Sequence, residues 1–389
     1  PPQRQRDYKR LQRELGEEYK VKGVNVNDGF VPADIDVLVV AKPGKLTDKQ
    51  KFGIDQFLMQ GGALVAFTGS RDISADRSGL NAAEADPGLL EILKHYGVEI
   101  ENGFAMDSRN ARFPVPVQDR SGPFNIRRIH MMNYPFFPDI RSEGMARGHV
   151  ALTGLHNVIM NWSSPLKVDE KSKEVKVDKL ITTSDQSWLY GEPDILPKSV
   201  READRAFQPS SDDKRGKKTL AAALVGRFDS YFTDKPSPLF GADEEKSTSE
   251  TDDKESLNEP DGKQSEPDRT GRTIKRSSAD ARLVVVGSSA FASDLVSNLA
   301  GQVGGGLYRG NFQLVRNLLD WSLADTDLLR IRTVGAFART LDPLQDRQRL
   351  LWEVGNYGFA LLALLAVVLL AAVRRRLVKP LLTREVKAS

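Results

Sequence analysis

The sequence lacks cysteine entirely and contains only four histidines in 389 residues. The absence of cysteine excludes disulfide bonds, thiolate nucleophiles and cysteine-based metal sites. The histidines, His95, His130, His149 and His156, form no HExxH or other compact metal-binding spacing. We therefore predict no metal site, no catalytic residue of these types and no cofactor.

The chain also has little net charge and no recognisable nucleotide-binding loop. A formal net charge of +3 provides no concentrated basic face, so nucleic acid is not an expected partner. The glycine-rich residues 301–306 (GQVGGG) lack the Lys-Ser/Thr ending of a phosphate-binding loop. If the protein takes part in an ATP-driven process, the energy must therefore come from another subunit.

One long apolar segment stands near the end of the chain. Residues 354–373 (VGNYGFALLALLAVVLLAAV) form a run of twenty, which is about 30 Å as a helix. Such a uniform run predicts a transmembrane helix rather than one face of an amphipathic helix. The predicted anchoring residues are interfacial aromatics, apolar core positions and a basic stop: Trp352, Tyr357, Phe359, Leu361, Leu365, Leu369, Arg374, Arg375 and Arg376.

The flanking charges predict the orientation of this helix. Residues 374–389 carry six basic residues against a single acid, Glu385, whereas the charges before the helix are balanced. The positive-inside bias predicts that the C-terminus lies in the cytoplasm and that the large domain is extracytoplasmic. The predicted location is the cytoplasmic (inner) membrane. Because the chain opens with Pro1 and a charged run, we expect an upstream region to be missing.

The ordered part of the chain is typical of an α/β domain. Residues 35–40 (IDVLVV) and 63–67 (ALVAF) predict buried strands, and the helix between them starts at Thr47-Asp48 and ends at Gly61-Gly62. Strand, helix and strand in close succession predict a βαβ unit with a parallel strand pair. We predict a mainly parallel sheet flanked by helices, with antiparallel additions between residues 150 and 228.

Other segments complete this prediction. They are a helix or exposed leader at 3–20, a short strand at 19–26, a helix at 87–96, a partly hairpin excursion at 102–147, a returning strand at 282–287 and an amphipathic helix at 311–323. Residues 243–268 hold eleven acids against three lysines, a composition that predicts disorder. The predicted organisation is a charged leader (1–18), an extracytoplasmic α/β domain (19–235), a disordered acidic loop (236–280), the return of the domain (281–327), a juxtamembrane connector (328–353), the transmembrane helix (354–373) and a cytoplasmic tail (374–389).

Candidate ligand-binding residues follow two of the predicted strands. Thr68, Ser70 and Arg71 come after residues 63–67, and Ser288 and Ser289 come after residues 282–287. Doubly wound folds bind ligands at such strand ends. The sequence around Ser288 lacks the second glycine of a G-x-S-x-G nucleophile elbow, so a helix cap is the preferred interpretation. No residue is predicted to be catalytic.

Three blocks and the terminal helix carry a family resemblance. The blocks are residues 34–67, 89–107 (LLEILKHYGVEIENGFAMD) and 282–294 (RLVVVGSSAFASD). With these features the chain resembles the auxiliary, substrate-binding-like subunits of uncharacterised ABC transport systems, a family named for gliding-motility proteins. The resemblance implies a class I glutamine-amidotransferase-like fold without its catalytic cysteine, an ABC permease and a separate ATP-binding subunit as partners, and no catalysis.

Two other functions remain open from the residues alone. One is a membrane-tethered hydrolase or amidotransferase-like enzyme that uses Ser288 or a carboxylate. The other is a structural adaptor whose sheet domain binds a protein filament or a cell-envelope component, with no small ligand at all. A cell-envelope polymer or an unknown ligand also stays open as a further partner. A deep polar crevice at the strand ends would favour ligand binding, and a filled face there would favour an adaptor.

Overall fold

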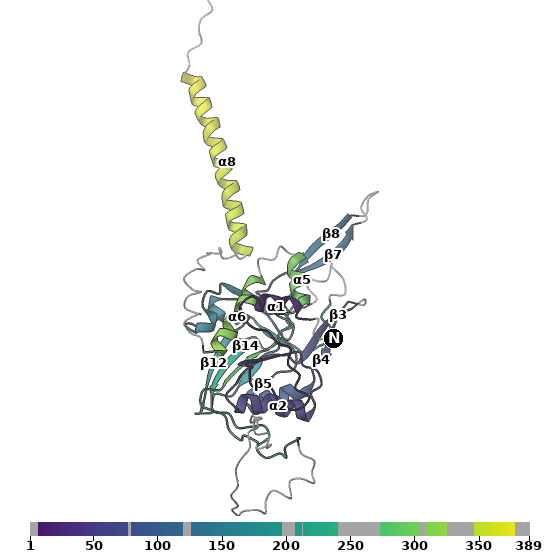
Figure 1. Ribbon diagram of the computed structural model, residues 1–389. Helices are drawn as coiled ribbons and strands as arrows, with labels where there is room; N and C mark the ends of the chain where they lie inside the picture. The colour runs from purple at the N-terminus through teal and green to yellow at the C-terminus, as the bar shows by residue number, and fades with distance from the viewer. Residues whose placement is uncertain are drawn as a thin grey trace, which may run out of the picture. The chain divides into compact units, whose positions relative to one another are not determined.

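The computed structural model describes residues 7–76, 79–119, 126–196, 207–211, 213–239, 273–302, 308–324 and 346–377. The chain divides into two compact units, Pro1–Phe337 and Ala338–Ser389. The first unit holds every described strand, and the second holds one long helix (Figure 1).

A seven-stranded sheet forms the centre of the first unit. Its strand order is β1-β2-β15-β14-β11-β5, and β12 also pairs with β14. The strands are β1 (Val37–Ala41), β2 (Ala63–Phe67), β15 (Arg282–Val286), β14 (Thr219–Gly226), β11 (Leu166–Val168), β5 (Val98–Ile100) and β12 (Val175–Thr182).

The predicted βαβ unit is confirmed at one end of this sheet. The strands β1 and β2 are parallel, and α2 (Asp48–Met59) connects them. Thr47 begins α2 with a capping box, because its hydroxyl accepts from the backbone N–H of Gln50 while the Gln50 side chain accepts from the backbone N–H of Thr47. The returning strand β15 lies parallel to β2, as predicted.

The predicted mainly parallel, amidotransferase-like sheet is wrong, because the sheet is mixed. Only the pairs β1–β2 and β15–β2 are parallel, whereas β14–β15, β11–β14, β12–β14 and β11–β5 are antiparallel. Parallel neighbours need a long crossover, usually a helix. The described residues between β5 and β14 contain no α-helix, which agrees with the antiparallel pairing of β11 and β12. The antiparallel additions predicted between residues 150 and 228 are therefore confirmed.

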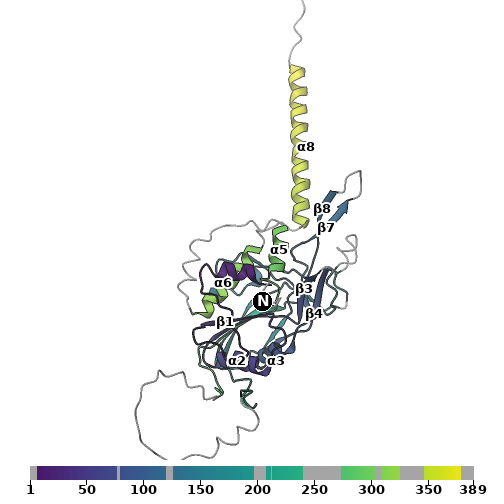
Figure 2. The same ribbon diagram turned by 45° about the vertical axis from the view of Figure 1, so that its right-hand side comes forward.

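The described part of the chain also contains four small antiparallel pairs outside the main sheet. They are β3 (Arg71–Asp76) with β4 (Gly79–Glu84), β7 (Phe113–Asp119) with β8 (Ile126–Met132), β6 (Phe104–Met106) with β13 (Trp188–Tyr190), and β9 (Asp139–Arg141) with β10 (Asn157–Ile159). The hairpin predicted within residues 102–147 is therefore confirmed. It is β7–β8, which projects from the body of this unit in both views (Figures 1 and 2).

Helices cover both faces of the sheet, and each face has its own core. On one face pack α1 (Lys9–Leu15) and α6 (Arg309–Ser322), with α5 (Asp294–Gln302) beside α1. The opposite face packs against α2 and α3 (Pro87–His95). A third, aromatic-rich cluster includes Tyr134, Phe136, Phe137 and Trp162. Short 3₁₀ turns occur at Ser142–Gly144 and Val150–Leu152.

The N-terminal charged run contains a packed helix. Tyr8, Leu11 and Leu15 are buried in the core, and the backbone N–H groups of Lys9 and Arg10 donate to the Asp294 carboxylate at 3.1 and 2.9 Å. Of the two forms predicted for this stretch, helix or exposed leader, the structure has the helix. The strand predicted at residues 19–26 is wrong, because that segment forms no strand.

Most of the predicted acidic loop, residues 240–272, lies outside the described residues. Its described flanks run side by side. Ser230 N–H donates to Lys275 O at 2.9 Å, and Ser277 N–H donates to Phe228 O at 2.9 Å. The strands β14 and β15 are therefore the two sides of a long hairpin that holds the acidic insertion at its tip.

The second unit contains α8 (Asp346–Leu377). Within it, Leu350–Arg375 is the one helical stretch among the described residues that is long and apolar enough to cross a membrane. The predicted span, residues 354–373, lies inside these bounds, and all the predicted anchoring residues belong to α8. Residues 328–345 of the predicted connector lie outside the described residues.

Candidate functional site

The structure brings the predicted ligand-binding residues to one edge of the sheet. Thr68, Ser70 and Arg71 follow β2, and Ser288 and Ser289 follow its parallel neighbour β15. All five are at most 9% exposed. They meet at the carboxyl ends of parallel strands, where open α/β sheets have their ligand crevice.

Residues 161–164 fill this position. The backbone N–H of Ser164 donates to Gly287 O at 2.6 Å, and the hydroxyl of Ser288 donates to Asn161 O at 2.6 Å. A Cβ atom on Gly287 would lie 2.2 Å from Ser164 O, so only glycine allows this close approach. Asn161, Ser163 and Ser164 are fully buried. The strand ends are therefore closed by the protein's own chain.

The hydroxyl of Ser70 is fully used inside the protein. It lies 2.9 Å from the Ser164 hydroxyl, accepts from the backbone N–H of Gly103 at 3.0 Å and lies 3.3 Å from Gly103 O. The backbone N–H of Ser70 also donates to the Ser164 hydroxyl at 2.9 Å. These bonds join three separate segments, so Ser70 has a stabilising role here.

The geometry around Ser288 is that of a cap. Its hydroxyl accepts from the backbone N–H groups of Ala290 and Phe291 at 3.2 and 3.1 Å. The Ser289 hydroxyl donates to the Asp72 carboxylate at 3.2 Å. Within the described part of the chain, no hydrogen bond links a histidine to either serine; His95, for example, contacts Asp229 O at 3.0 Å. The described residues thus do not assemble a Ser-His-acid arrangement.

Two other predicted residues near the strand ends are equally buried. Arg71 donates from its guanidinium to Gly191 O at 2.9 Å, which ties β3 to the loop after β13. Thr68 continues the sheet, since its backbone N–H donates to Val286 O at 3.1 Å. The five predicted residues are brought together, but they face one another and the main chain rather than a cavity.

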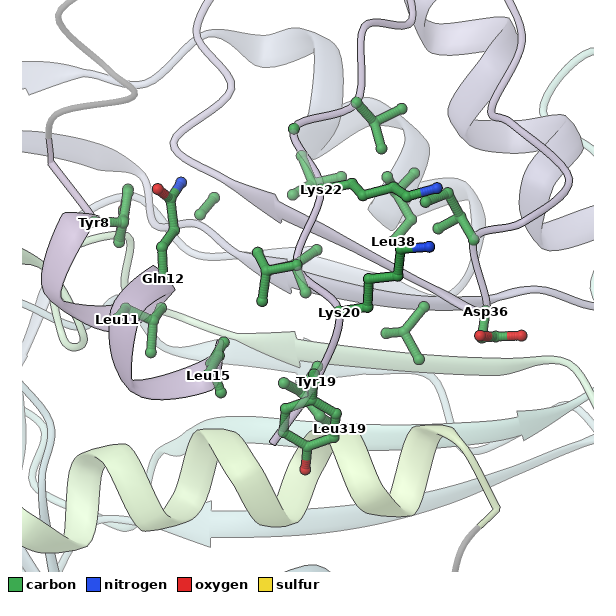
Figure 3. Close-up of a pocket in the computed structure, with 18 of the residues that line it drawn as sticks. Tyr8, Leu11, Gln12, Leu15, Tyr19, Lys20, Lys22, Asp36, Leu38 and Leu319 are labelled. Carbon is green, nitrogen blue, oxygen red and sulfur yellow. The ribbon is translucent and has the colours of Figure 1, made fainter. Parts of the chain in front are cut away.

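One cavity among the described residues lies elsewhere, beside the edge strand β1. It has a volume of about 790 Å³ and is bounded by α1, β1, the end of α6 and the extended segment 18–26 (Figure 3). Sequence reasoning missed it, because the strand order that leaves β1 at an edge cannot be read from local patterns.

The walls of this cavity are mostly apolar. Leu11 and Leu15 come from α1, Val39 from β1, and Leu319 and Leu323 from the end of α6. Charged side chains also line it, including Lys20, Lys42 and Asp36, together with Lys22, which forms an ion pair with Asp34. We call this cavity the β1 groove.

Comparison with known proteins identifies the family. A family model described as "ABC-type uncharacterized transport system" matches residues 2–320, so the chain belongs to this family. It is thus an auxiliary component of an ABC-type transport system. No curated protein matches the chain. A solved structure titled "mmIFT52 N-terminal domain" has 10% sequence identity and a TM-score of 0.39, over 82% of this chain and 91% of that chain.

The family description names transport alone. The link to gliding motility that the resemblance implied has no support in these matches, and neither has the amidotransferase-like fold.

Proposed function

We propose that this protein is a non-catalytic, membrane-anchored auxiliary subunit whose outer α/β domain docks on an ABC permease. A separate ATP-binding subunit supplies the energy. Family membership supports the transport role. The observation that carries the rest is the combination of the apolar helix α8 with a domain whose strand ends are filled.

The filled strand ends favour contact with a protein over presentation of a small ligand. The hydroxyls of Ser70 and Ser288 are already hydrogen-bonded inside the protein, Ser288 to the main chain and Ser70 to both the main chain and the Ser164 hydroxyl. A ligand at this edge would have to displace buried, bonded residues, which is unfavourable. A surface docking role needs no such displacement.

We further propose that α8 packs against the permease as well as anchoring the domain. Small residues follow one side of the helix at Ala360, Ala363 and Ala366, which would allow close helix packing. In this topology the C-terminus is cytoplasmic and the domain extracytoplasmic, because the basic residues cluster after the helix.

The test is purification of the full-length chain from its native membranes in mild detergent, followed by identification of the recovered proteins. We expect a multispanning permease and an ATP-binding subunit. The double variant Ala360→Leu/Ala363→Leu should stay in the membrane and recover less permease. Its matched control, Leu365→Val/Leu369→Val, changes the opposite side of α8 and should recover the normal amount. Recovery of neither partner with the unmodified chain would reject the proposal.

A separate experiment tests the membrane topology. Because the sequence has no native cysteine, each introduced cysteine is the one thiol that the reagent can label. Single cysteines at Ser211 and Ser389 are labelled in intact cells with a membrane-impermeant thiol reagent. We expect labelling at position 211 and none at position 389. The reverse pattern would overturn the proposed orientation.

A further inference from the structure

Residues 161–164, which cover the strand ends, contain buried polar atoms without partners. The side-chain oxygen and nitrogen of Asn161 and the hydroxyl of Ser163 make no hydrogen bond in the protein, and both residues are fully buried. Among the described residues seven buried side-chain atoms lack a partner, and three of them belong to this short segment. An unpaired buried polar group costs free energy. The covered arrangement is therefore less stable than its burial alone would suggest.

The Asn161 amide lies beside the Tyr308 hydroxyl without completing a hydrogen bond. Burial raises the pKa of Tyr308 to about 12, and the nearby Asn161 amide opposes this rise. The two side chains are thus close, yet both polar atoms of Asn161 stay unpartnered. The backbone of residues 161–164, rather than the Asn161 side chain, therefore holds the amide in this place.

Trp162 combines a strained backbone with an anchored ring. Its φ of 46° lies in the left-handed region, which is unfavourable for a residue other than glycine. The ring centroid lies 4.7 Å from that of Phe137, and Nε1–H donates to the Tyr134 hydroxyl at 3.0 Å. The ring is therefore fixed in the aromatic-rich cluster, whereas the main chain around it is held in an unfavourable conformation.

Strands hold the chain on both sides of this segment. The strand β10 pairs with β9 before it, and β11 pairs with β14 and β5 after it. Beyond Trp162, two backbone bonds hold the segment: Ser163 O accepts from Ala105 N–H at 2.7 Å, and Ser164 N–H donates to Gly287 O at 2.6 Å. Hinges are a few residues that absorb a large change in φ and ψ. Trp162 has the position and the stored strain of such a hinge.

We propose that residues 161–164 are a gate over the strand ends and that Trp162 is its hinge. The structure has the closed form. In the open form the Trp162 backbone leaves the left-handed region while its ring stays in place, and the unpartnered polar atoms reach solvent. Opening frees the hydroxyls of Ser70 and Ser288 at the carboxyl ends of β2 and β15, where open α/β sheets bind ligands. This inference goes beyond the proposed docking function and does not depend on it.

Thiol labelling of the full-length chain in detergent measures the opening, since the sequence has no native cysteine. Ser163→Cys places the thiol on the gate and removes no hydrogen bond, because the Ser163 hydroxyl has no partner. The matched control is Ser187→Cys, whose hydroxyl is equally buried and unpartnered but lies outside the gate. We expect a water-soluble thiol reagent to label position 163 at least about tenfold faster than position 187 in the folded chain. Equal rates would overturn the proposal.

A second substitution tests whether the unpartnered atoms favour opening. Asn161→Leu, made in the Ser163→Cys background, replaces two unpartnered buried atoms by apolar ones and should stabilise the closed form. We expect labelling at least about fivefold slower than with Ser163→Cys alone. Unchanged or faster labelling would contradict the gate, because it would show that the Asn161 side chain supports the closed form or has no part in it.

Hydrogen exchange provides a measurement that needs no cysteine and applies even if the cysteine variants fold poorly. In the unmodified chain, peptides covering residues 161–164 should exchange at least about tenfold faster than peptides covering β15, which the gate contacts. Asn161→Leu should slow exchange in residues 161–164 at least about threefold and leave β15 unchanged. Equal protection of the two segments, or faster exchange in the variant, would show that the strand ends have no gate of this kind.

Discussion

Two regions at the border of the main sheet have opposite properties: the strand-end face, which is the set of residues at the carboxyl ends of β2 and β15, and the β1 groove along the lateral edge. The first has the polar residues expected of a binding site, but residues 161–164 fill it. The second has no motif in the sequence, yet it holds about 790 Å³ of space. Polar residues at strand ends therefore do not by themselves indicate a ligand site in a mixed sheet.

The cause of this difference is the antiparallel half of the sheet. The segment that enters β11 passes over the ends of β2 and β15, where a wholly parallel fold would leave its crevice. No corresponding segment pairs with β1 among the described residues. The following predictions test this contrast, beginning with the largest effect.

Gly287→Ala should destabilise the strand-end face most. Its Cβ would lie 2.2 Å from Ser164 O, and main chain cannot move aside as a flexible side chain can. We expect a loss of about 3 kcal/mol in the free energy of unfolding. The measurement is denaturant unfolding of the full-length chain in detergent, followed by tryptophan fluorescence. Gly191→Ala, which meets nothing within 4 Å, is the matched control and should stay within about 0.5 kcal/mol of the unmodified chain.

Ser288→Ala should lower stability by about 2 kcal/mol, because it leaves Asn161 O and the N–H groups of Ala290 and Phe291 without this partner in a buried site. The same unfolding experiment applies, with the exposed Ser108→Ala as control. An unchanged unfolding midpoint for Ser288→Ala would mean that water reaches the strand ends and that the face is open.

Val39→Thr sharpens the contrast at the groove. Val39 is 37% exposed, so we expect this change to alter the free energy of unfolding by less than about 0.5 kcal/mol. Val65→Thr, in register with Val39 but fully buried, should lose about 2 kcal/mol. The same unfolding experiment measures both variants, and equal losses would show that Val39 is as well covered as Val65.

His149, beside the end of α6, should give the smallest effect. Burial lowers the pKa of His149 in the folded protein, although Asp178 opposes this shift and Lys176 adds to it. The unfolded state then binds a proton more readily below about pH 6.5, so the stability present at higher pH is lost as the pH falls. Protonation of Nδ1 would also remove the acceptor that holds Ala151 N–H at 3.3 Å.

The measurement compares unfolding at about pH 7.5 and about pH 5. We expect the free energy of unfolding to fall more for the unmodified chain than for His149→Gln. An equal fall in both would show that other groups, not His149, set the pH dependence.

Local patterns in the sequence predicted the local structure well. The capped helix after Thr47, the parallel pair β1–β2, the helix from Pro87 and the return of the chain at β15 all follow from apolar runs and start or stop residues. The lack of helical patterns between residues 150 and 228 also predicted antiparallel additions there, and β11, β12 and β14 are antiparallel to their neighbours. The same patterns could not predict that these strands make up most of the sheet, because an apolar run does not show which strands it will pair with.

The candidate site was predicted only in part, for a related reason. The strand ends place Thr68 and Ser288 at one edge, which the order of strands and helices implies. Nothing local indicates that residues 161–164 cover that edge, because the contacts between Ser164 and Gly287 span more than a hundred residues. The spacing of Tyr8, Leu11 and Leu15 was the one available signal that the charged run contains a buried helix face.

The stem of the β14–β15 hairpin has a consequence for how this protein tolerates change. Backbone bonds between Ser230 and Lys275 and between Phe228 and Ser277, together with the buried Asp55 that accepts from Ser230, hold both ends of the acidic insertion in place. The entropy of closing a loop rises only with the logarithm of its length, by about 0.6 kcal/mol for each doubling. Because the closure point is fixed, we expect that lengthening or shortening the insertion by tens of residues would change the stability of the sheet by only about 1 kcal/mol. The insertion between β14 and β15 is thus a position where sequences of different length can be exchanged with little loss of stability.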